Sequence, residues 1–131
     1  MQQLATTREN SVTEIVSLVD DDPAVLKSVA RLLASDGLGV LEFSEPISFL
    51  QHVQACRVPL VILDIWMEQM TGLEVQAHLC TLSPETRVII ITGAQDLATE
   101  RVALQAGAFR FFFKPFDDEE FLAAVHEALD Q

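Results

Sequence analysis

Residues 61–74 read VILDIWMEQMTGLE and join an apolar run, an aspartate, a loop and the start of a helix. The run Leu60–Leu63 is continuously apolar, as expected for a parallel strand that is buried on both faces. It ends at Asp64, and the loop 65–71 leads to Gly72, after which apolar residues recur at helical spacing. This segment therefore predicts a strand, a loop and a helix, with a carboxylate at the end of the strand.

The same alternation of apolar runs and amphipathic stretches repeats along the chain. The predicted strands cover 15–19, 40–43, 60–63, 87–91 and 109–113. The predicted helices begin at Pro23, after Ser44 as the cap, at Gly72, near Asp96, and after Asp117 or Asp118 as the cap. Strands that alternate with helices of this length indicate a parallel sheet with helices on both faces. In such sheets, ligands bind beyond the carboxyl ends of the strands, where the strand order reverses.

The chain has 131 residues, of which 50% are hydrophobic, and a formal net charge of -12. A domain typically holds ~100–150 residues, so we expect one domain, over 14–131. Residues 1–13 are polar and show no periodic pattern, so we expect them to form a leader. Binding to phosphates needs clustered lysine and arginine, so the acidity argues against direct nucleic-acid binding by this domain and against docking on an anionic membrane. No basic region precedes an apolar run at the start, and no aliphatic run approaches the ~20 residues of a membrane span. We therefore expect a cytoplasmic location.

The two cysteines, Cys56 and Cys80, lack the spacing of a CxxC motif or of a zinc site. We expect both to be reduced thiols that are buried or half-buried, as in cytosolic proteins.

Polar side chains follow four of the five predicted strands. They are Asp20 and Asp21 after the first strand, Asp64 after the third, Thr92 after the fourth and Lys114 after the fifth. Three carboxylates that lie together raise one another's pKa, and a divalent cation relieves the repulsion. Oxygen ligands with room for water suit Mg²⁺, and a lysine with a hydroxyl beside the metal suits a phosphoryl group. These strand ends therefore predict a site for a metal ion and a phosphate.

Four motifs carry a family resemblance: LVDDDPAV (18–25), VILDIWMEQMTGLE (61–74), VIIITG (88–93) and LQAGAFRFFFKPF (104–116). In their order and spacing, the chain resembles the receiver domains of two-component response regulators, and those of the nitrogen-fixation regulators in particular. The resemblance runs from about Ile15 to the C-terminus. It implies a flavodoxin-like (βα)₅ fold with strand order 2-1-3-4-5, and a signalling switch that is not an enzyme.

The resemblance also implies a role for each strand-end residue. Asp64 is the expected phosphoacceptor, and a sensor histidine kinase is the expected donor and partner. Asp20, Asp21, Asp64 and the backbone carbonyl of Trp66 are the expected ligands of Mg²⁺, with Mn²⁺ as an alternative ion. The usual family motif has a proline after the methionine of this loop, where the chain has Glu68.

Thr92 and Lys114 are expected to contact the phosphoryl group, and Phe111 occupies the position of the switch aromatic. The peptide bond between Lys114 and Pro115 is expected to be cis. Phosphorylation is then expected to change the surface of the fourth helix, fifth strand and fifth helix, to favour a homodimer there, and to control transcription through an attached or partner DNA-binding domain.

Three further predictions concern the faces of the fifth strand, the role of Trp66 and the alternative functions of the domain. Along the fifth strand, Phe109, Phe111 and Phe113 are expected to share one face, with Phe112 on the other. The bulky Trp66 would shield the phosphoryl group from water. The alternatives are an unphosphorylated interaction module and, less favoured, a Mg²⁺-dependent phosphohydrolase of the haloacid dehalogenase type, which needs an aspartate where the chain has Trp66.

Overall fold

The computed structural model describes residues 14–93 and 97–130. In this part of the chain, the strands form one parallel sheet with the order β2-β1-β3-β4-β5. The strands are β1 (Ile15–Val19), β2 (Gly39–Phe43), β3 (Leu60–Asp64), β4 (Arg87–Thr92) and β5 (Arg110–Phe113). The helices are α1 (Pro23–Ser35), α2 (Pro46–Ala55), α3 (Gly72–Leu82), α4 (Leu97–Gln105) and α5 (Asp118–Leu129). The predicted flavodoxin-like fold and strand order are confirmed.

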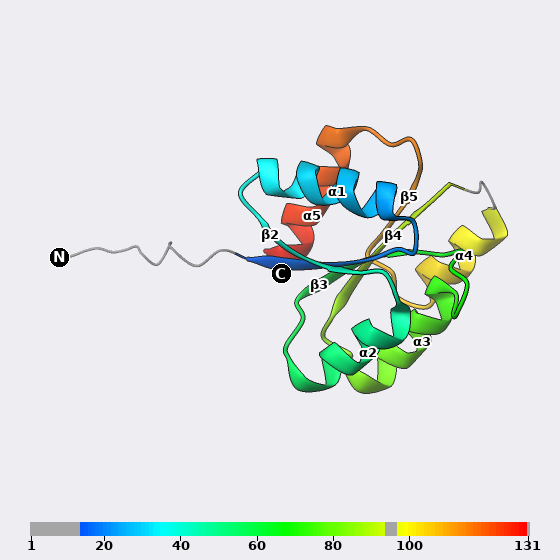
Figure 1. Ribbon diagram of the computed structural model, residues 1–131. Coiled ribbons are helices and arrows are strands. Elements are labelled where there is room, and N and C mark those ends of the chain that lie inside the picture. Colours follow the sequence, from blue (N-terminus) through cyan, green and yellow to red (C-terminus); the bar gives the residue numbers. More distant parts are fainter. Residues whose placement is uncertain (1–13, 94–96, 131) are drawn as a thin grey trace.

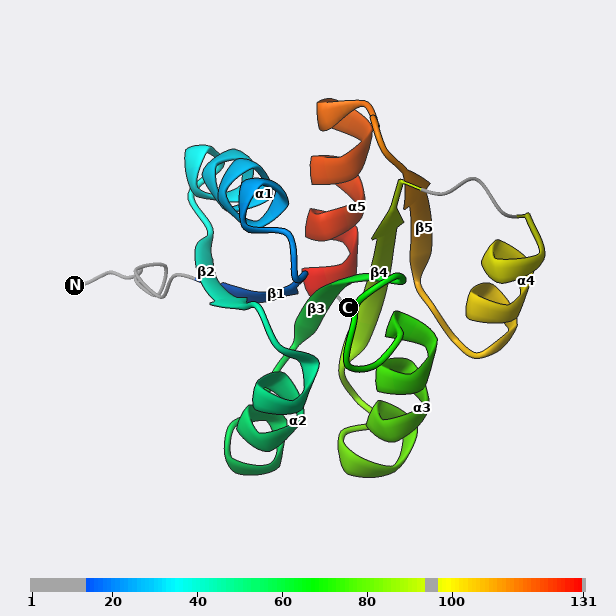
Figure 2. The same ribbon diagram turned by 45° about the vertical axis from the view of Figure 1, so that its right-hand side comes forward.

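Helices cover both faces of the sheet (Figures 1 and 2). α1 and α5 lie on one face, and α2, α3 and α4 lie on the other. The sheet has a hydrophobic core on each of its faces. Alternate residues of β3 point into these two cores, because successive side chains of a strand point to opposite faces. Leu60 and Ile62 pack with α1 and α5, whereas Val61 and Leu63 pack with α2 and α3. All four are fully buried, which confirms the reading of this strand.

The caps of the helices place the loops that surround the carboxyl edge of the sheet. Asp22 caps α1, because its Oδ1 accepts a hydrogen bond from the amide of Ala24 at 2.9 Å. Asp117 caps α5 in the same way, through the amide of Glu120 at 2.8 Å. α3 begins with a capping box in which Thr71 and Glu74 each bind the other's backbone amide. This box fixes the start of α3 directly after the β3–α3 loop.

Two sequence expectations were wrong in detail. Ser44 does not cap α2: Glu45 occupies the cap position without a side-chain hydrogen bond, and Pro46 sets the first turn. Phe109 precedes β5 and packs in the same core as Phe112, because the strand begins only at Arg110.

Cys56 and Cys80 are free, as expected, but both are exposed. The 1–13 leader and the expected helix start at Asp96 lie outside the described residues.

Candidate functional site

Three carboxylates converge where β1 and β3 end. Asp20 and Asp64 are buried, with 1% and 7% of their surfaces exposed, whereas Asp21 is exposed. One carboxylate oxygen from each lies within 4.8 Å of the others. The cause is topological, since β1 and β3 are parallel neighbours and their carboxyl ends meet at one edge. The predicted cluster is therefore present.

A backbone amide holds each of these carboxylates. The amide of Asp22 donates to Asp20 Oδ1 at 2.9 Å, and the amide of Glu68 donates to Asp21 Oδ2 at 3.1 Å. Asp64 accepts a hydrogen bond from the amide of Ile65. Within residues 14–93 and 97–130, the buried oxygens Asp20 Oδ2 and Asp64 Oδ1 accept no hydrogen bond. Each buried acid thus has a bond to the backbone and a second oxygen that could serve another ligand.

The two buried acids resist ionisation. Burial, and next the charge of Asp20, raise the pKa of Asp64 from 3.8 to about 6, against the lowering effect of Lys114. Burial likewise raises the pKa of Asp20. A cation near the free oxygens would favour the charged forms of both acids. The electrostatics of this edge therefore match the expected binding of a cation.

Lys114 reaches the cluster from the end of β5. Its Nζ lies 3.5 Å from Asp20 Oδ2. This separation is beyond an ordinary hydrogen bond but within the range of a strong Coulomb attraction. The amide of Lys114 donates to the carbonyl of Thr92 at 2.8 Å, so the ends of β4 and β5 are tied together. The peptide bond between Lys114 and Pro115 is cis, as expected.

Thr92 and Phe111 lie on the two strands beyond β3. Thr92 is the last residue of β4 and is buried, with 1% of its surface exposed. Phe111 is half-buried against the core under α2 and α3, and its ring packs edge-to-face on Phe113 at 5.2 Å. Both residues therefore lie on β4 and β5, the two strands between Asp64 at the end of β3 and helix α4.

The β3–α3 loop packs closely around Asp64. Within it, the side chain of Met67 is buried while that of Trp66 is 52% exposed. Gly72 follows the loop, and its amide donates to the carbonyl of Ile65 at 2.8 Å. A β-carbon on Gly72 would lie 2.3 Å from the backbone oxygen of Asp64, which is far inside contact distance. Glycine is therefore required here for close packing, a function that the sequence reading did not assign to it.

The donor set fits Mg²⁺ in chemical type. It consists of carboxylate oxygens, two of them buried and without a hydrogen-bond donor among the described residues. Hard cations select such oxygen ligands, and Mg²⁺ commonly binds one or two carboxylates and retains several waters. The exposed side of the cluster at Asp21 leaves room for water and for an incoming anion.

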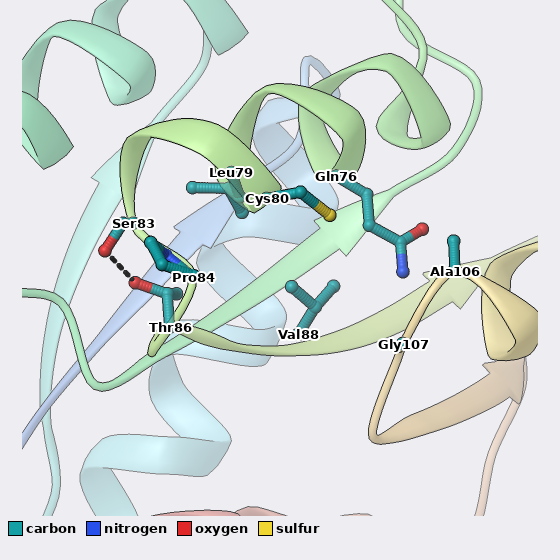
Figure 3. Close-up of a pocket in the computed structure, with 9 residues that line it drawn as sticks. All are labelled: Gln76, Leu79, Cys80, Ser83, Pro84, Thr86, Val88, Ala106 and Gly107. Atoms are coloured by element: carbon teal, nitrogen blue, oxygen red, sulfur yellow. Dashed lines mark hydrogen bonds between the residues drawn. The ribbon is translucent and has the colours of Figure 1, made fainter.

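A separate cavity of about 130 Å³ lies at the opposite edge of the sheet, where α3 and α4 end (Figure 3). Gln76 lines it and donates from Nε2 to the carbonyl of Ala103 in α4 at 3.0 Å. Thr86 also lines it, and its hydroxyl donates to the carbonyl of Val58 at 2.7 Å. These bonds tie α3, α4 and β4 to their neighbours, and the residues that line the cavity include none of the expected site residues.

Comparison with known proteins identifies relatives along nearly the whole chain. Residues 16–126 match the family model described as the response regulator receiver domain. The chain is 39% identical over 127 residues to the response regulator protein TmoT of Ectopseudomonas mendocina, covering 97% of this chain and 58% of that protein. It is 40% identical over 115 residues to the response regulator protein TodT of Pseudomonas putida, covering 88% and 51%. It is 36% identical over 114 residues to the transcriptional regulatory protein FixJ of Azorhizobium caulinodans, covering 87% and 54%.

Solved structures share the fold. A CheY-like receiver domain protein from Methanospirillum hungatei superposes with a TM-score of 0.84 at 28% identity, over 91% of this chain and 95% of that one. The beryllofluoride-activated receiver domain dimer of NtrC4 gives 0.84 at 28% identity, over 88% and 96%.

The chain spans between half and three fifths of the length of the three sequence relatives above. Among the described residues, no helix is long and apolar enough to cross a membrane. The match to the family model, the sheet order and the acidic edge agree, and the chain belongs to the response regulator receiver domains, a family of non-enzymatic signalling domains.

Proposed function

We propose that this domain accepts a phosphoryl group from a sensor histidine kinase onto Asp64, in a reaction that requires Mg²⁺. The observation that carries the proposal is the buried carboxylate cluster, with an oxygen of each buried acid available to a ligand and Lys114 at 3.5 Å from Asp20. Mg²⁺ is proposed to bind Asp20, Asp21, Asp64 and the backbone carbonyl of Trp66.

In the proposed reaction, an oxygen of Asp64 forms a bond to phosphorus while the bond from phosphorus to the kinase histidine nitrogen breaks. The products are an acyl phosphate on Asp64 and a free kinase histidine. Phosphoryl transfer depends mainly on positioning and on neutralisation of charge. Bound Mg²⁺ would supply part of that neutralisation. Lys114 supplies a fixed positive charge beside the cluster, and the amide of Ile65 keeps Asp64 oriented.

The proposed output begins at Thr92, whose hydroxyl would bind an oxygen of the new phosphoryl group. Movement of Thr92 would favour a different position of Phe111, because the two residues lie on adjacent strands. Phosphorylation shifts such an equilibrium only through contacts that differ between the two states. The expected readout is the surface of α4, β5 and α5.

We further propose that this surface forms a homodimer after phosphorylation. α4 exposes two apolar side chains that line the same surface hollow, with 72% of Leu97 and 44% of Leu104 accessible. Exposed apolar groups that lie together favour association. A structural relative, the NtrC4 receiver domain, is described as a beryllofluoride-activated dimer.

Transcriptional control is proposed as the output, because the sequence relatives include transcriptional regulatory proteins that are longer than this chain. The domain's net charge of -12 supports a route to DNA through another domain and not through its own surface. The cytoplasm is the proposed location, because a sensor kinase would have to reach Asp64.

The test is incubation with acetyl phosphate, or with beryllofluoride, in the presence of Mg²⁺. With acetyl phosphate, an adduct of one phosphoryl group is expected by mass spectrometry. With either reagent, the fluorescence of Trp66, the single tryptophan of the chain, should change. The Asp64→Asn variant should form no adduct. An unreactive wild type would contradict the proposal and favour an interaction module. A phosphorylated Asp64→Asn variant would also contradict it, because the acceptor would then be a residue other than Asp64.

A further inference from the structure

We propose that the backbone amide of Glu68 is a positioning group for the Mg²⁺ ligand Asp21. Its N–H binds one oxygen of the Asp21 carboxylate, so that the other oxygen is held ready for the metal. This inference rests on the proposed function, because it assumes that the carboxylate cluster binds Mg²⁺.

The contact joins two loops that are far apart in sequence. The nitrogen of Glu68, in the β3–α3 loop, lies 3.1 Å from Asp21 Oδ2, in the β1–α1 loop 47 residues earlier. Asp21 is exposed, and an exposed aspartate without such a bond samples several rotamers. Hydrogen bonds to a charged acceptor are stronger than neutral ones. The contact therefore selects one orientation of Asp21 before any metal arrives.

The other two carboxylates show the same arrangement. The amide of Asp22 binds Asp20 Oδ1, and the amide of Ile65 binds Asp64. In the part of the chain that the structure describes, Asp20 Oδ2 and Asp64 Oδ1 accept no hydrogen bond. Each buried acid is thus fixed by the backbone and keeps an oxygen for another ligand. The amide of Glu68 gives Asp21 the equivalent support.

This support depends on the type of residue at position 68. Proline has no backbone N–H and could not donate to Asp21. Proline is also the usual residue after the methionine of this loop in the family that the chain resembles. Glu68 therefore adds a hydrogen-bond donor to the metal site, independently of the charge of its side chain.

The side chain and the backbone of Glu68 are separated by a pair of variants. Glu68→Ala removes the carboxylate but keeps the N–H, whereas Glu68→Pro removes both. Mg²⁺ is titrated into each protein without a phosphodonor, and binding is read from Trp66 fluorescence and from calorimetry. Loss of a group that orients a metal ligand typically weakens binding 10–100-fold. We expect Glu68→Pro to bind Mg²⁺ about tenfold more weakly than Glu68→Ala.

A second measurement can decide the question even if the Glu68→Pro variant does not fold. Hydrogen exchange of the Glu68 amide is followed by nuclear magnetic resonance in the metal-free protein. We expect slow exchange in the wild type and about tenfold faster exchange in Asp21→Ala, which lacks the acceptor. Circular dichroism checks that each variant is folded. If the proline variant does not fold, the exchange rates decide.

The possible results distinguish the positioning role of the Glu68 amide from the proposed function on which it rests. Equal or tighter Mg²⁺ binding by a folded Glu68→Pro variant, relative to Glu68→Ala, overturns the positioning role and leaves the proposed function intact. Exchange at Glu68 that is unaffected by Asp21→Ala also overturns it. A wild type that binds no Mg²⁺ overturns both, whatever the exchange rates.

Discussion

Replacing Asp64 with asparagine should stabilise the metal-free protein at neutral pH. The asparagine side chain would keep an oxygen that can accept the hydrogen bond from the Ile65 amide, and the change would remove a buried negative charge beside Asp20. The wild-type side chain is 7% exposed and has a pKa raised from 3.8 to about 6, chiefly by burial. Its ionised form is therefore less favourable in the folded protein than in the unfolded chain.

The size of the effect follows from this difference in pKa. One pKa unit corresponds to about 1.4 kcal/mol, so the change from 3.8 to about 6 costs the folded state about 3 kcal/mol at pH 7. Between these two values the folded protein binds more protons than the unfolded chain. The contribution of Asp64 to the stability of the folded state is thus most favourable below pH 3.8, where the carboxyl is protonated in both states. That contribution is lost as the pH rises through about 6. At pH 5, the cost has fallen to roughly half of its value at pH 7.

Thermal or urea unfolding in the presence of a chelator measures the effect. At pH 7, we expect Asp64→Asn to exceed the wild type by up to about 3 kcal/mol, or a Tm higher by roughly 10 °C. The gain should shrink by about half at pH 5. Glu42→Gln is the matched control, because it removes one exposed carboxylate from β2 and should change stability little.

Added Mg²⁺ should stabilise the wild type and reduce the difference in stability between Asp64→Asn and the wild type, since a ligand that binds only the folded state raises its stability. An Asp64→Asn variant that is no more stable than the wild type at pH 7 would refute the reasoning. A gain that is equal at pH 5 and pH 7 would also refute it, because the stabilisation would then not come from the charge of Asp64.

Four further substitutions test other parts of the domain. Gly72→Ala should destabilise the fold by about 1–3 kcal/mol in urea unfolding and slow phosphorylation, because its β-carbon would meet the Asp64 backbone oxygen at 2.3 Å. Gly93→Ala, whose β-carbon would have open space, should be tolerated in the same unfolding assay. Trp66→Asn should shorten the lifetime of the phosphorylated protein, measured by loss of the mass adduct, if the exposed indole shields the phosphoryl group; an unchanged lifetime would contradict that hypothesis. Thr86→Val should cost about 1–2 kcal/mol of unfolding free energy, because the carbonyl of Val58 loses its hydrogen bond at 2.7 Å.

The fold and the acidic edge were predictable because they depend on periodicity and on parallel strands. Asp64 follows a run that is apolar at every position, and a strand buried on both faces ends where its first charge appears. Parallel pairing then brings Asp20, Asp21 and Asp64 to one edge without any knowledge of loop geometry.

Features that depend on the ends of elements were less predictable. Phe109 was placed on the wrong face because one residue at the start of β5 reverses the alternation of side chains. The capping box of Thr71 and Glu74 fits a recognisable spacing and could have been found from the sequence. The contact between Glu68 and Asp21 could not, because its partners lie 47 residues apart and meet only after both loops are folded.

The β3–α3 loop positions two different parts of the candidate site, through one contact at its end and another in its middle. Gly72 lets the end of the loop approach the backbone of Asp64, where a β-carbon at 2.3 Å would push the acid out of place. Glu68, in the middle of the loop, binds Asp21 beyond the end of the neighbouring strand. A shift of the loop would therefore change the separation of Asp64 and Asp21 as well as their orientation. For this reason, we expect substitutions in this loop to alter Mg²⁺ affinity even where the carboxylates themselves are unchanged.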